Sequence, residues 1–312
     1  MENYSDYFEA NKHIWNQRTA VHKDSSFYDM AGFKEGKDVL TPIELRELGD
    51  VSGKTMLHLQ CHFGMDSLNW SRKGAKVTGV DLSDNAIEEA RRLNTDLGFD
   101  AKFICCNVYD LDPSGSSPLA NEKYDIVFTS YGTVGWLPDL DRWARIIFHH
   151  LKPGGIFYIA EFHPVVWMFD DEFTHIKYHY ENRELIVTEN IGTYTDRKAA
   201  ISGKEYSWNH SLGEVINALI KQGLRIEYLN EYMYSPYPCF NNTVQGSDGN
   251  WYIKGMEGKI PMVYSVKAVK PYFQKVAKCD NKRQQTASYL PFSVHQFPYL
   301  RSEKMYLNAT EV

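Results

Sequence analysis

The middle of the chain alternates short runs of β-branched and aromatic residues with amphipathic segments, and this pattern restricts the fold most. The apolar runs lie at 55–59, 76–80, 101–105, 124–129 and 156–162. Strands separated by helical segments form a parallel sheet, because each crossover between parallel strands needs a long connection. The sequence therefore predicts an α/β fold of the Rossmann-like kind, with helices on both faces of the sheet.

The segments between these runs carry helix signals. Ser83 is a suitable N-cap, and the apolar residues after it recur at intervals of three and four, which places them on one face: Ala86, Ala90, Leu93 and Leu97. A second stripe consists of Leu140, Trp143, Ile147 and Leu151. Ser211 and Glu214 form a capping box that predicts a third helix. The motif at 152–155, Lys-Pro-Gly-Gly, is expected to end the second helix and turn into the fifth strand.

The segments outside the alternating pattern define the organisation of the chain. Residues 1–40 are rich in aromatic residues and are predicted to form a helical cap, followed by a main domain over 41–271. Within that domain, 164–209 alternates polar and apolar residues, as at 177–180 and 185–188, and is predicted to be an inserted β-hairpin with loops. The tail, 272–312, shows no periodicity, and we expect it to be poorly ordered.

Composition excludes several classes of function. A net charge of −6 argues against a general nucleic-acid binder, which needs a basic surface. No run approaches the ~20 apolar residues that span a bilayer, and the first residues are polar rather than typical of a signal peptide. The five cysteines form no CxxC pair, which suits reduced thiols. We therefore predict a cytoplasmic protein with no membrane or nucleic-acid partner.

Ligands of such sheets bind at the carboxyl ends of the strands. The segment His58–Asp66 begins at the end of the first predicted strand, and Asp81 follows the second. A carboxylate at this place can accept hydrogen bonds from both ribose hydroxyls of an adenosine group; the alternative is a surface or capping residue. His58, Cys61 and His62 lie close together, but their spacing is not that of a zinc site, and no metal is predicted.

Four motifs in this order give the chain a family resemblance. They are a glycine-containing turn after the first strand, Val-Thr-Gly-Val-Asp-Leu-Ser at 77–83, Tyr-Asp-Ile-Val at 124–127, and Leu-Lys-Pro-Gly-Gly at 151–155. Over roughly 53–270 the chain resembles the class I S-adenosylmethionine-dependent methyltransferases, in their small-molecule branch. The resemblance implies a seven-stranded, mostly parallel sheet whose last strand, 262–269, is antiparallel. It also implies S-adenosylmethionine as cofactor and a small-molecule methyl acceptor.

The first turn departs from the family pattern, Asp-x-Gly-x-Gly-x-Gly. The matching positions hold His58, Gln60, His62 and Gly64, so only the last glycine is kept. Glycines at these places let the backbone approach the methionine part of the cofactor. Gln60 and His62 therefore imply either a wider turn or side chains that themselves contact the ligand.

The resemblance also assigns other candidate residues. Asn107 would bind the adenine amine, Val108 would line the adenine slot, and Leu82 would pack against the adenine ring. Thr129, Ser130 and Tyr131 would lie where the methionine end and the acceptor meet. The alternative for each is ordinary packing at the end of the sheet.

Two residues are candidates for the chemistry itself. Tyr131 could present an aromatic face to the sulfonium charge. His163 follows the fifth strand, and an imidazole there could act as a base toward the acceptor. A histidine hydrogen bonded at the edge of the sheet is the alternative.

The predicted function is methyl transfer from S-adenosylmethionine to an oxygen, nitrogen, sulfur or carbon atom of a small molecule. A non-catalytic protein that binds S-adenosylmethionine is an alternative, suggested by the altered first turn. An NAD-dependent oxidoreductase is another, although Gly-x-Gly-x-x-Gly is absent between Leu57 and Asp66. The identity of the acceptor and the oligomeric state stay open.

Overall fold

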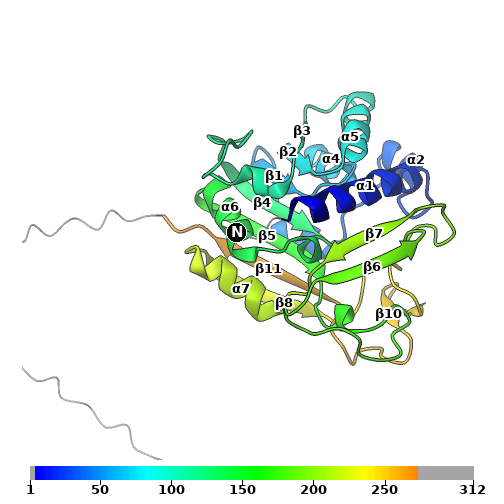
Figure 1. Cartoon of the computed structure of the whole chain (residues 1–312). Helices are drawn as coiled ribbons and strands as arrows, with labels where there is room; N and C mark the ends of the chain where they lie inside the picture. Colours follow the sequence, from blue (N-terminus) through cyan, green and yellow to red (C-terminus); the bar gives the residue numbers. More distant parts are fainter. Residues whose placement is uncertain (1–3, 273–312) are drawn as a thin grey trace, which may run out of the picture. The chain divides into compact units, whose positions relative to one another are not determined.

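A seven-stranded sheet forms the centre of the molecule in the computed structural model, which describes residues 4–272 (Figure 1). The strand order is β3-β2-β1-β4-β5-β11-β8, and β11 runs antiparallel to both of its neighbours while the other pairs are parallel. The predicted sheet and its reversed last strand are confirmed. The strands are β1 Thr55–Leu59, β2 Lys76–Asp81, β3 Lys102–Cys105, β4 Tyr124–Ser130, β5 Leu151–Phe162, β8 Arg225–Tyr232 and β11 Val263–Val269.

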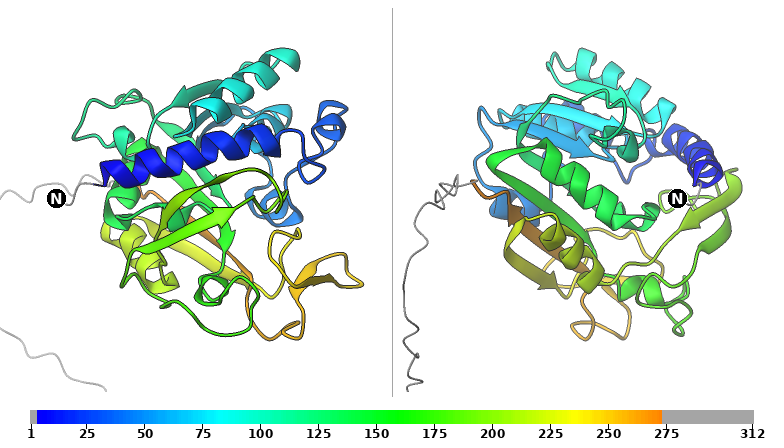
Figure 2. Two further views of the ribbon diagram at one scale, coloured as in Figure 1. Left: turned by 45° about the vertical axis from the view of Figure 1, so that its right-hand side comes forward. Right: turned by 60° about the vertical axis from the view of Figure 1, so that its left-hand side comes forward.

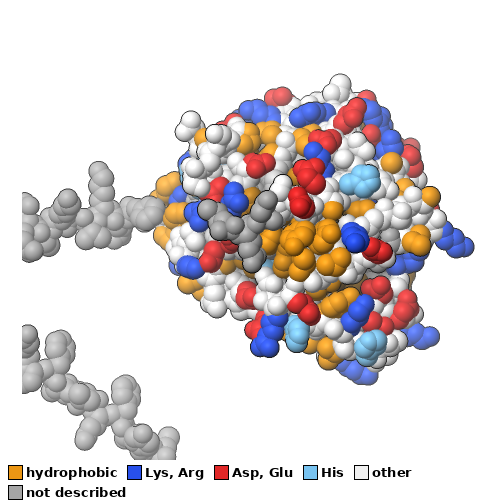
Figure 3. Space-filling model, in the orientation of Figure 1, with side chains coloured by type: hydrophobic (Ala, Val, Ile, Leu, Met, Phe, Trp, Pro, Cys, Tyr) orange, Lys and Arg blue, Asp and Glu red, His pale blue; other side chains and the backbone are white. Residues whose placement is uncertain are grey.

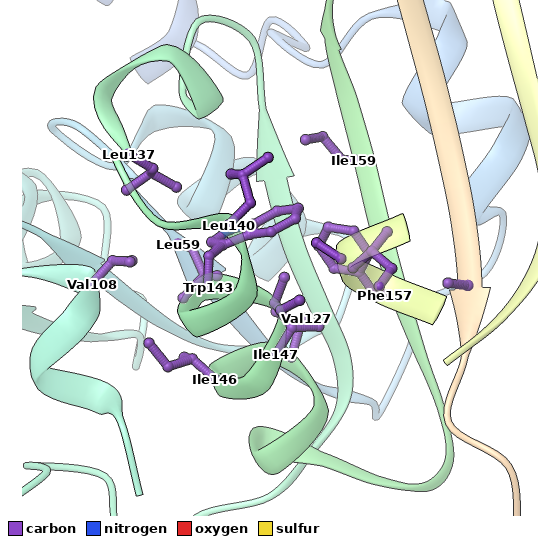
Figure 4. Close-up of a cluster of buried hydrophobic side chains, with 14 of the residues drawn as sticks. Leu59, Val108, Val127, Leu137, Leu140, Trp143, Ile146, Ile147, Phe157 and Ile159 are labelled. Carbon is purple, nitrogen blue, oxygen red and sulfur yellow. The ribbon is translucent and has the colours of Figure 1, made fainter. Parts of the chain in front are cut away.

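Helices cover both faces of the sheet because its strands are apolar on both sides. Leu57 and Leu59 pack with Trp143 in one cluster, whereas Met56 packs with Ile43 and Trp70 in another. Neighbouring residues of a strand point to opposite faces, so β1 serves both clusters. Figure 4 shows the first cluster between the sheet and α6. The helices are α6 Leu140–His150 and α7 Leu212–Lys221 on that face, and α3 Pro42–Leu48, α4 Met65–Arg72 and α5 Asp84–Asp96 on the other.

The predicted helix starts are present as capping interactions. Ser83 Oγ accepts a hydrogen bond from Ala86 N at 3.1 Å at the start of α5. Ser211 and Glu214 form the reciprocal capping box of α7. These caps satisfy backbone N–H groups that have no partner within the helix.

Two predicted segments differ in the structure. The motif at 152–155 lies inside β5 rather than in a turn, because Gly154 N and Gly155 O are both hydrogen bonded to the backbone of Lys270 at the end of β11. The alternating segment at 177–180 is not a strand, since the backbone N–H groups of Lys177 and Tyr178 both donate to Met168 O. Met168 ends a 3-10 turn, η3 Val166–Met168.

The insert does contain the predicted hairpin, formed by β6 Ile186–Ile191 and β7 Ser202–Ser207. A second, unpredicted hairpin is formed by β9 Thr243–Gln245 and β10 Trp251–Ile253. Both lie outside the seven-stranded sheet (Figure 2).

The N-terminal cap is helical, with α1 Ser5–His22 and α2 Met30–Lys34. Helix α1 lies beside β7, as the views of Figures 1 and 2 show. At the start of α1, Tyr7 stacks on Tyr206 with ring centroids 4.6 Å apart. Hydrophobic side chains gather on the surface at this junction (Figure 3). The cap and the insert, far apart in sequence, thus form one layer.

The predicted tail lies outside the described residues beyond Tyr272. Within residues 4–272, no helix combines the length and the apolar character needed to cross a bilayer.

Two neighbouring residues of α7 test this packing. Leu219 is fully buried, whereas Ile220 is 52 % exposed. Leu219→Ala should lower the free energy of unfolding by about 2–5 kcal/mol, because it removes buried methyl groups and leaves a cavity. Ile220→Ala, a change of similar size, should cost about 0.5 kcal/mol or less. Urea-induced unfolding measures both, and equal losses would contradict the assigned burial.

Candidate functional site

A cavity of about 1060 Å³ opens at the carboxyl ends of the central strands. Residues that follow β1, β2, β3, β4 and β5 line it, together with residues of α1, the β6–β7 insert and the segment after β8. Thr129 and His163 are not among the described residues that line it, whereas the other nine candidate residues from the sequence are: Gln60, His62, Gly64, Asp81, Leu82, Asn107, Val108, Ser130 and Tyr131. The volume lies at the upper end of the ~300–1000 Å³ typical of small-molecule sites, so the cavity is large enough for a cofactor and a second molecule.

Asp81 at the end of β2 is fixed by two backbone donors. Its Oδ1 accepts a hydrogen bond from Ser83 N at 2.9 Å, and its Oδ2 accepts one from His62 N at 2.8 Å. A carboxylate offers about four lone pairs, so acceptor capacity remains for a ligand. Burial raises the pKa of this carboxyl to about 6, although the backbone donors oppose the shift.

Two residues other than glycine in the turn after β1 adopt a left-handed backbone conformation. Gln60 has a φ of 54° and His62 a φ of 49°, followed by Gly64 at 79°. Left-handed conformations are costly for residues with a Cβ and occur mainly at functional sites. The backbone therefore takes a conformation normally adopted by glycines, and the side chains of Gln60 and His62 line the cavity.

Both side chains leave a polar atom unsatisfied. Gln60 Nε2 donates to Thr133 O at 3.0 Å, and His62 Nε2 lies 3.0 Å from His22 Nδ1. Gln60 Oε1 and His62 Nδ1 are buried and have no hydrogen-bond partner among the described residues. Buried polar atoms are nearly always hydrogen bonded, so these two atoms of the cavity wall are available for contacts with a bound ligand.

Asn107 is partly used by the protein itself. Its Oδ1 accepts a hydrogen bond from Tyr109 N at 3.0 Å, which caps the 3-10 helix η1 Val108–Leu111. Asn107 also lines the cavity beside Val108. The cap fixes the orientation of the side chain and leaves its amide nitrogen for other contacts.

Glu161, which the sequence reasoning did not select, organises the loop after β4. Its carboxylate accepts hydrogen bonds from the backbone N–H groups of Gly132, Thr133 and Val134, and from Thr133 Oγ1 at 2.8 Å. Glu161 is 3 % exposed and has no cationic partner among the described residues. An acidic residue inside the apolar run of β5 was the only sequence signal for this role.

His163 does not join the other candidates. It is absent from the described residues that line the cavity, and it is 3 % exposed. Its Nε2 lies 2.9 Å from Glu231 Oε1, and its Nδ1 accepts a hydrogen bond from Val165 N at 3.1 Å. Both ring nitrogens are therefore occupied, one by Glu231 on β8 and the other by Val165 after β5, as in the structural alternative.

The cap and the insert close over the cavity through long-range contacts. Asn11 hydrogen bonds to both the N–H and the C=O of Tyr206, and Arg18 forms a buried ion pair with Glu205. His22 Nε2 lies 2.6 Å from Thr193 Oγ1. These contacts join α1 to the insert, and Asn11, Arg18, Thr193 and Glu205 also line the cavity.

The described residues contain no group of three or more His, Cys, Asp or Glu side chains that could hold a metal ion. Several carboxyl groups, histidines and tyrosines line the cavity. Burial lowers the pKa of His22 to about 3 and the pKa of His62 well below its usual value.

Comparison with known proteins agrees with this architecture. A model of the family described as "Methyltransferase domain" matches residues 56–155, which contain the turn after β1 and Asp81. Over this segment the match supports the resemblance to the S-adenosylmethionine-dependent methyltransferases that the sequence motifs predict.

Relatives of the chain include the ubiquinone biosynthesis O-methyltransferase of Serratia proteamaculans (strain 568). It is 28 % identical over 136 residues, or 42 % of this chain and 54 % of that protein. An S-adenosyl-L-methionine-dependent Diels-Alderase of Talaromyces variabilis is 29 % identical over 110 residues, or 35 % of this chain and 37 % of that protein. The chain thus spans about half the length, or less, of these curated relatives.

Among solved structures, an S-adenosylmethionine-dependent methyltransferase from Listeria monocytogenes shares the fold, with a TM-score of 0.51. Its sequence is 21 % identical, and the match covers 74 % of this chain and 96 % of that chain.

Glu161→Gln tests whether the carboxylate holds the loop after β4. The amide keeps one acceptor oxygen but turns an NH₂ group toward backbone N–H donors, which leaves buried donors unsatisfied. We expect the free energy of unfolding to fall by at least about 2 kcal/mol in urea-induced unfolding. Glu227→Gln, on the exposed end of β8, should cost about 0.5 kcal/mol or less. Similar values for the two variants would show that Glu161 does not hold the loop.

Proposed function

We propose that this protein transfers the methyl group of S-adenosylmethionine to a small-molecule acceptor. The observation that carries the proposal is the Asp81 carboxylate, fixed by His62 N and Ser83 N inside the cavity. It stands where the two ribose hydroxyls of an adenosine group would need acceptors.

The residues around Asp81 fit the rest of such a cofactor. Leu82 and Val108 provide apolar walls for an adenine ring, and Asn107 offers an amide beside them. Gln60 Oε1 and His62 Nδ1 need partners, and a ligand with several polar groups can supply them. Ser130 and Tyr131, at the end of β4, would face the methionine end.

Bound S-adenosylmethionine supplies a methyl group that is already activated by the sulfonium charge, so the protein mainly has to position, desolvate and orient. Tyr131 presents an aromatic ring to the cavity, and we retain it as the residue that faces the reacting groups. The cap and the insert exclude water from the site. His163, whose ring nitrogens are both occupied, is not part of this proposal.

We place this reaction in the cytoplasm, with no nucleic acid as partner. Cys61, Cys105, Cys106 and Cys239 are free thiols, which suits a reducing compartment. The net charge of −6 does not favour binding to a polyanion.

Asp81→Ala should weaken binding of S-adenosylhomocysteine by at least about tenfold in calorimetry. Each charge-assisted hydrogen bond from a ribose hydroxyl contributes about 1.5–3 kcal/mol, and 1.4 kcal/mol corresponds to tenfold. Glu88→Gln, an exposed residue on α5, is the matched control and should bind normally. Unchanged affinity of the Asp81 variant would refute the ribose assignment.

Two further measurements on the unmodified protein separate the proposed function from its alternatives. Thermal-shift measurements with S-adenosylhomocysteine and NAD side by side should show stabilisation by the first ligand. Stabilisation by NAD alone would support an oxidoreductase. Binding without transfer of a labelled methyl group to any compound of a cell extract would support a non-catalytic protein.

The affinity for S-adenosylhomocysteine should also depend on pH. The pKa of Asp81 in the ligand-free protein is about 6, so the carboxyl gains a proton as the pH falls through 6 and loses acceptor strength. One linked proton gives up to about a tenfold loss of affinity per pH unit below that value. Asp81→Asn, which cannot ionise, should show a flatter profile in calorimetry between pH 5 and 8. Equal slopes for the two proteins would mean that another group controls binding.

A further inference from the structure

Part of the cavity, which we call the acceptor chamber, lies beside the predicted methionine end and is formed by Glu44, Asp66, Tyr28, Tyr131 and Tyr237. Resting on the proposed function, we propose that this chamber binds the methyl acceptor as an amine in its ammonium form. The case depends on two carboxylates, the rings around them and a neutral histidine.

Glu44 on α3 and Asp66 in the first turn of α4 both face the cavity. Glu44 is 1 % exposed, and its Oε2 accepts hydrogen bonds from Thr41 Oγ1 and, at 3.3 Å, from Tyr131 OH. Asp66 Oδ2 accepts one from Ser130 Oγ at 3.1 Å. Burial, and to a smaller extent the charge of Asp66, raises the pKa of Glu44.

Neither carboxylate has a cationic partner among residues 4–272. Of the Arg and Lys residues that line the cavity, Arg18 is buried and paired with Glu205, and Lys37 at the rim is paired with Asp29. The third, Arg197, is exposed and forms no ion pair with Glu44 or Asp66. Buried carboxylates are stable only when they are paired or protonated. A positively charged ligand group would supply the missing counter-charge.

Aromatic rings enclose these carboxylates. The ring centroids of Tyr131 and Tyr237 lie 5.3 Å apart in an edge-to-face arrangement, and Tyr131 also packs against Phe162 at 5.5 Å. Burial, and to a smaller extent the charge of Asp66, raises the pKa of Tyr28, Tyr131 and Tyr237. Tyrosine faces attract cations and add to the pull of a carboxylate on an ammonium group.

His58 on β1 is an independent indication of a ligand. It is 2 % exposed and lines the same cavity, and its Nδ1 lies 2.7 Å from Ser67 Oγ. Its Nε2 has no hydrogen-bond partner in the described part of the chain. Burial lowers the pKa of His58 to about 3, so the ring is neutral and does not itself neutralise the chamber.

The negative charge of the acceptor chamber distinguishes between anionic, neutral and cationic methyl acceptors. A phosphate or carboxylate on the acceptor would be repelled by Asp66, and an alcohol would leave the carboxylates without a counter-ion. An ammonium group pairs with Asp66 and contacts the tyrosine rings. Before reaction it can give a proton to a carboxylate: the N–H bond breaks, an O–H bond forms, and the nitrogen keeps its electron pair as a neutral amine.

Matched pairs of small probes test this proposal with the whole chain. Benzylamine and benzyl alcohol, and cyclohexylamine and cyclohexanol, are compared by calorimetry and thermal shift at neutral pH, with and without S-adenosylhomocysteine. We expect each amine to bind at least about tenfold more tightly than its alcohol. Amines that bind no better than their alcohols, or not at all, overturn the proposal whether or not S-adenosylhomocysteine binds.

Variants locate the binding site. Asp66→Asn and Glu44→Gln should each weaken benzylamine binding at least about tenfold and leave S-adenosylhomocysteine binding nearly intact. Asp24→Asn, an exposed residue after α1, is the control for a lost negative charge. If Asp66→Asn weakens S-adenosylhomocysteine as strongly as benzylamine, Asp66 serves the cofactor, and the assignment to the acceptor is wrong.

The experiments can contradict the amine site and the proposed function independently of each other. If benzylamine binding depends on Glu44 and Asp66 while S-adenosylhomocysteine does not bind, the amine site stands and the proposed function fails. If S-adenosylhomocysteine binds through Asp81 and the amines do not bind, the reverse holds. Should a variant not fold, the comparison of amine with alcohol on the unmodified protein still decides.

Discussion

The site depends on the contact between the Asp81 carboxylate and His62 N. Together with the bond from Cys61 N to Val80 O, this hydrogen bond joins the turn after β1 to the end of β2. It fixes the carboxylate for a ribose and helps to hold a turn whose left-handed residues, Gln60 and His62, are costly by themselves. In this backbone conformation, the side chains of Gln60 and His62 both line the cavity.

Local patterns predicted the sheet because its central strands, such as β1 and β4, are buried runs. Caps such as Ser83 act within one turn of helix. The start of β5 was mispredicted because its pairing with Lys270 joins residues distant in sequence. The same reason hid the role of Glu161 and the contact of Arg18 with Glu205, which are 187 positions apart. His163 has the right place in sequence, but its ring is engaged by Glu231 on another strand.

The cap and the insert convert an open sheet edge into an enclosed site. Neither segment belongs to the central sheet, yet Asn11 and Arg18 from one meet Tyr206 and Glu205 from the other over the cavity. Enclosure also accounts for the electrostatics. It raises the pKa of Asp81 and of Asp66 to about 6 and keeps the histidines of the cavity neutral. The enclosed form of the cavity and the shifted pKa values of its side chains therefore have the same cause, because both follow from the removal of water at the edge of the sheet.

A crystal structure of the protein with S-adenosylhomocysteine tests the central claim most directly. The account predicts that both ribose hydroxyls donate to the Asp81 carboxylate, with the adenine beside Leu82 and Val108. A nucleoside bound elsewhere, or a ribose turned away from Asp81, would contradict it.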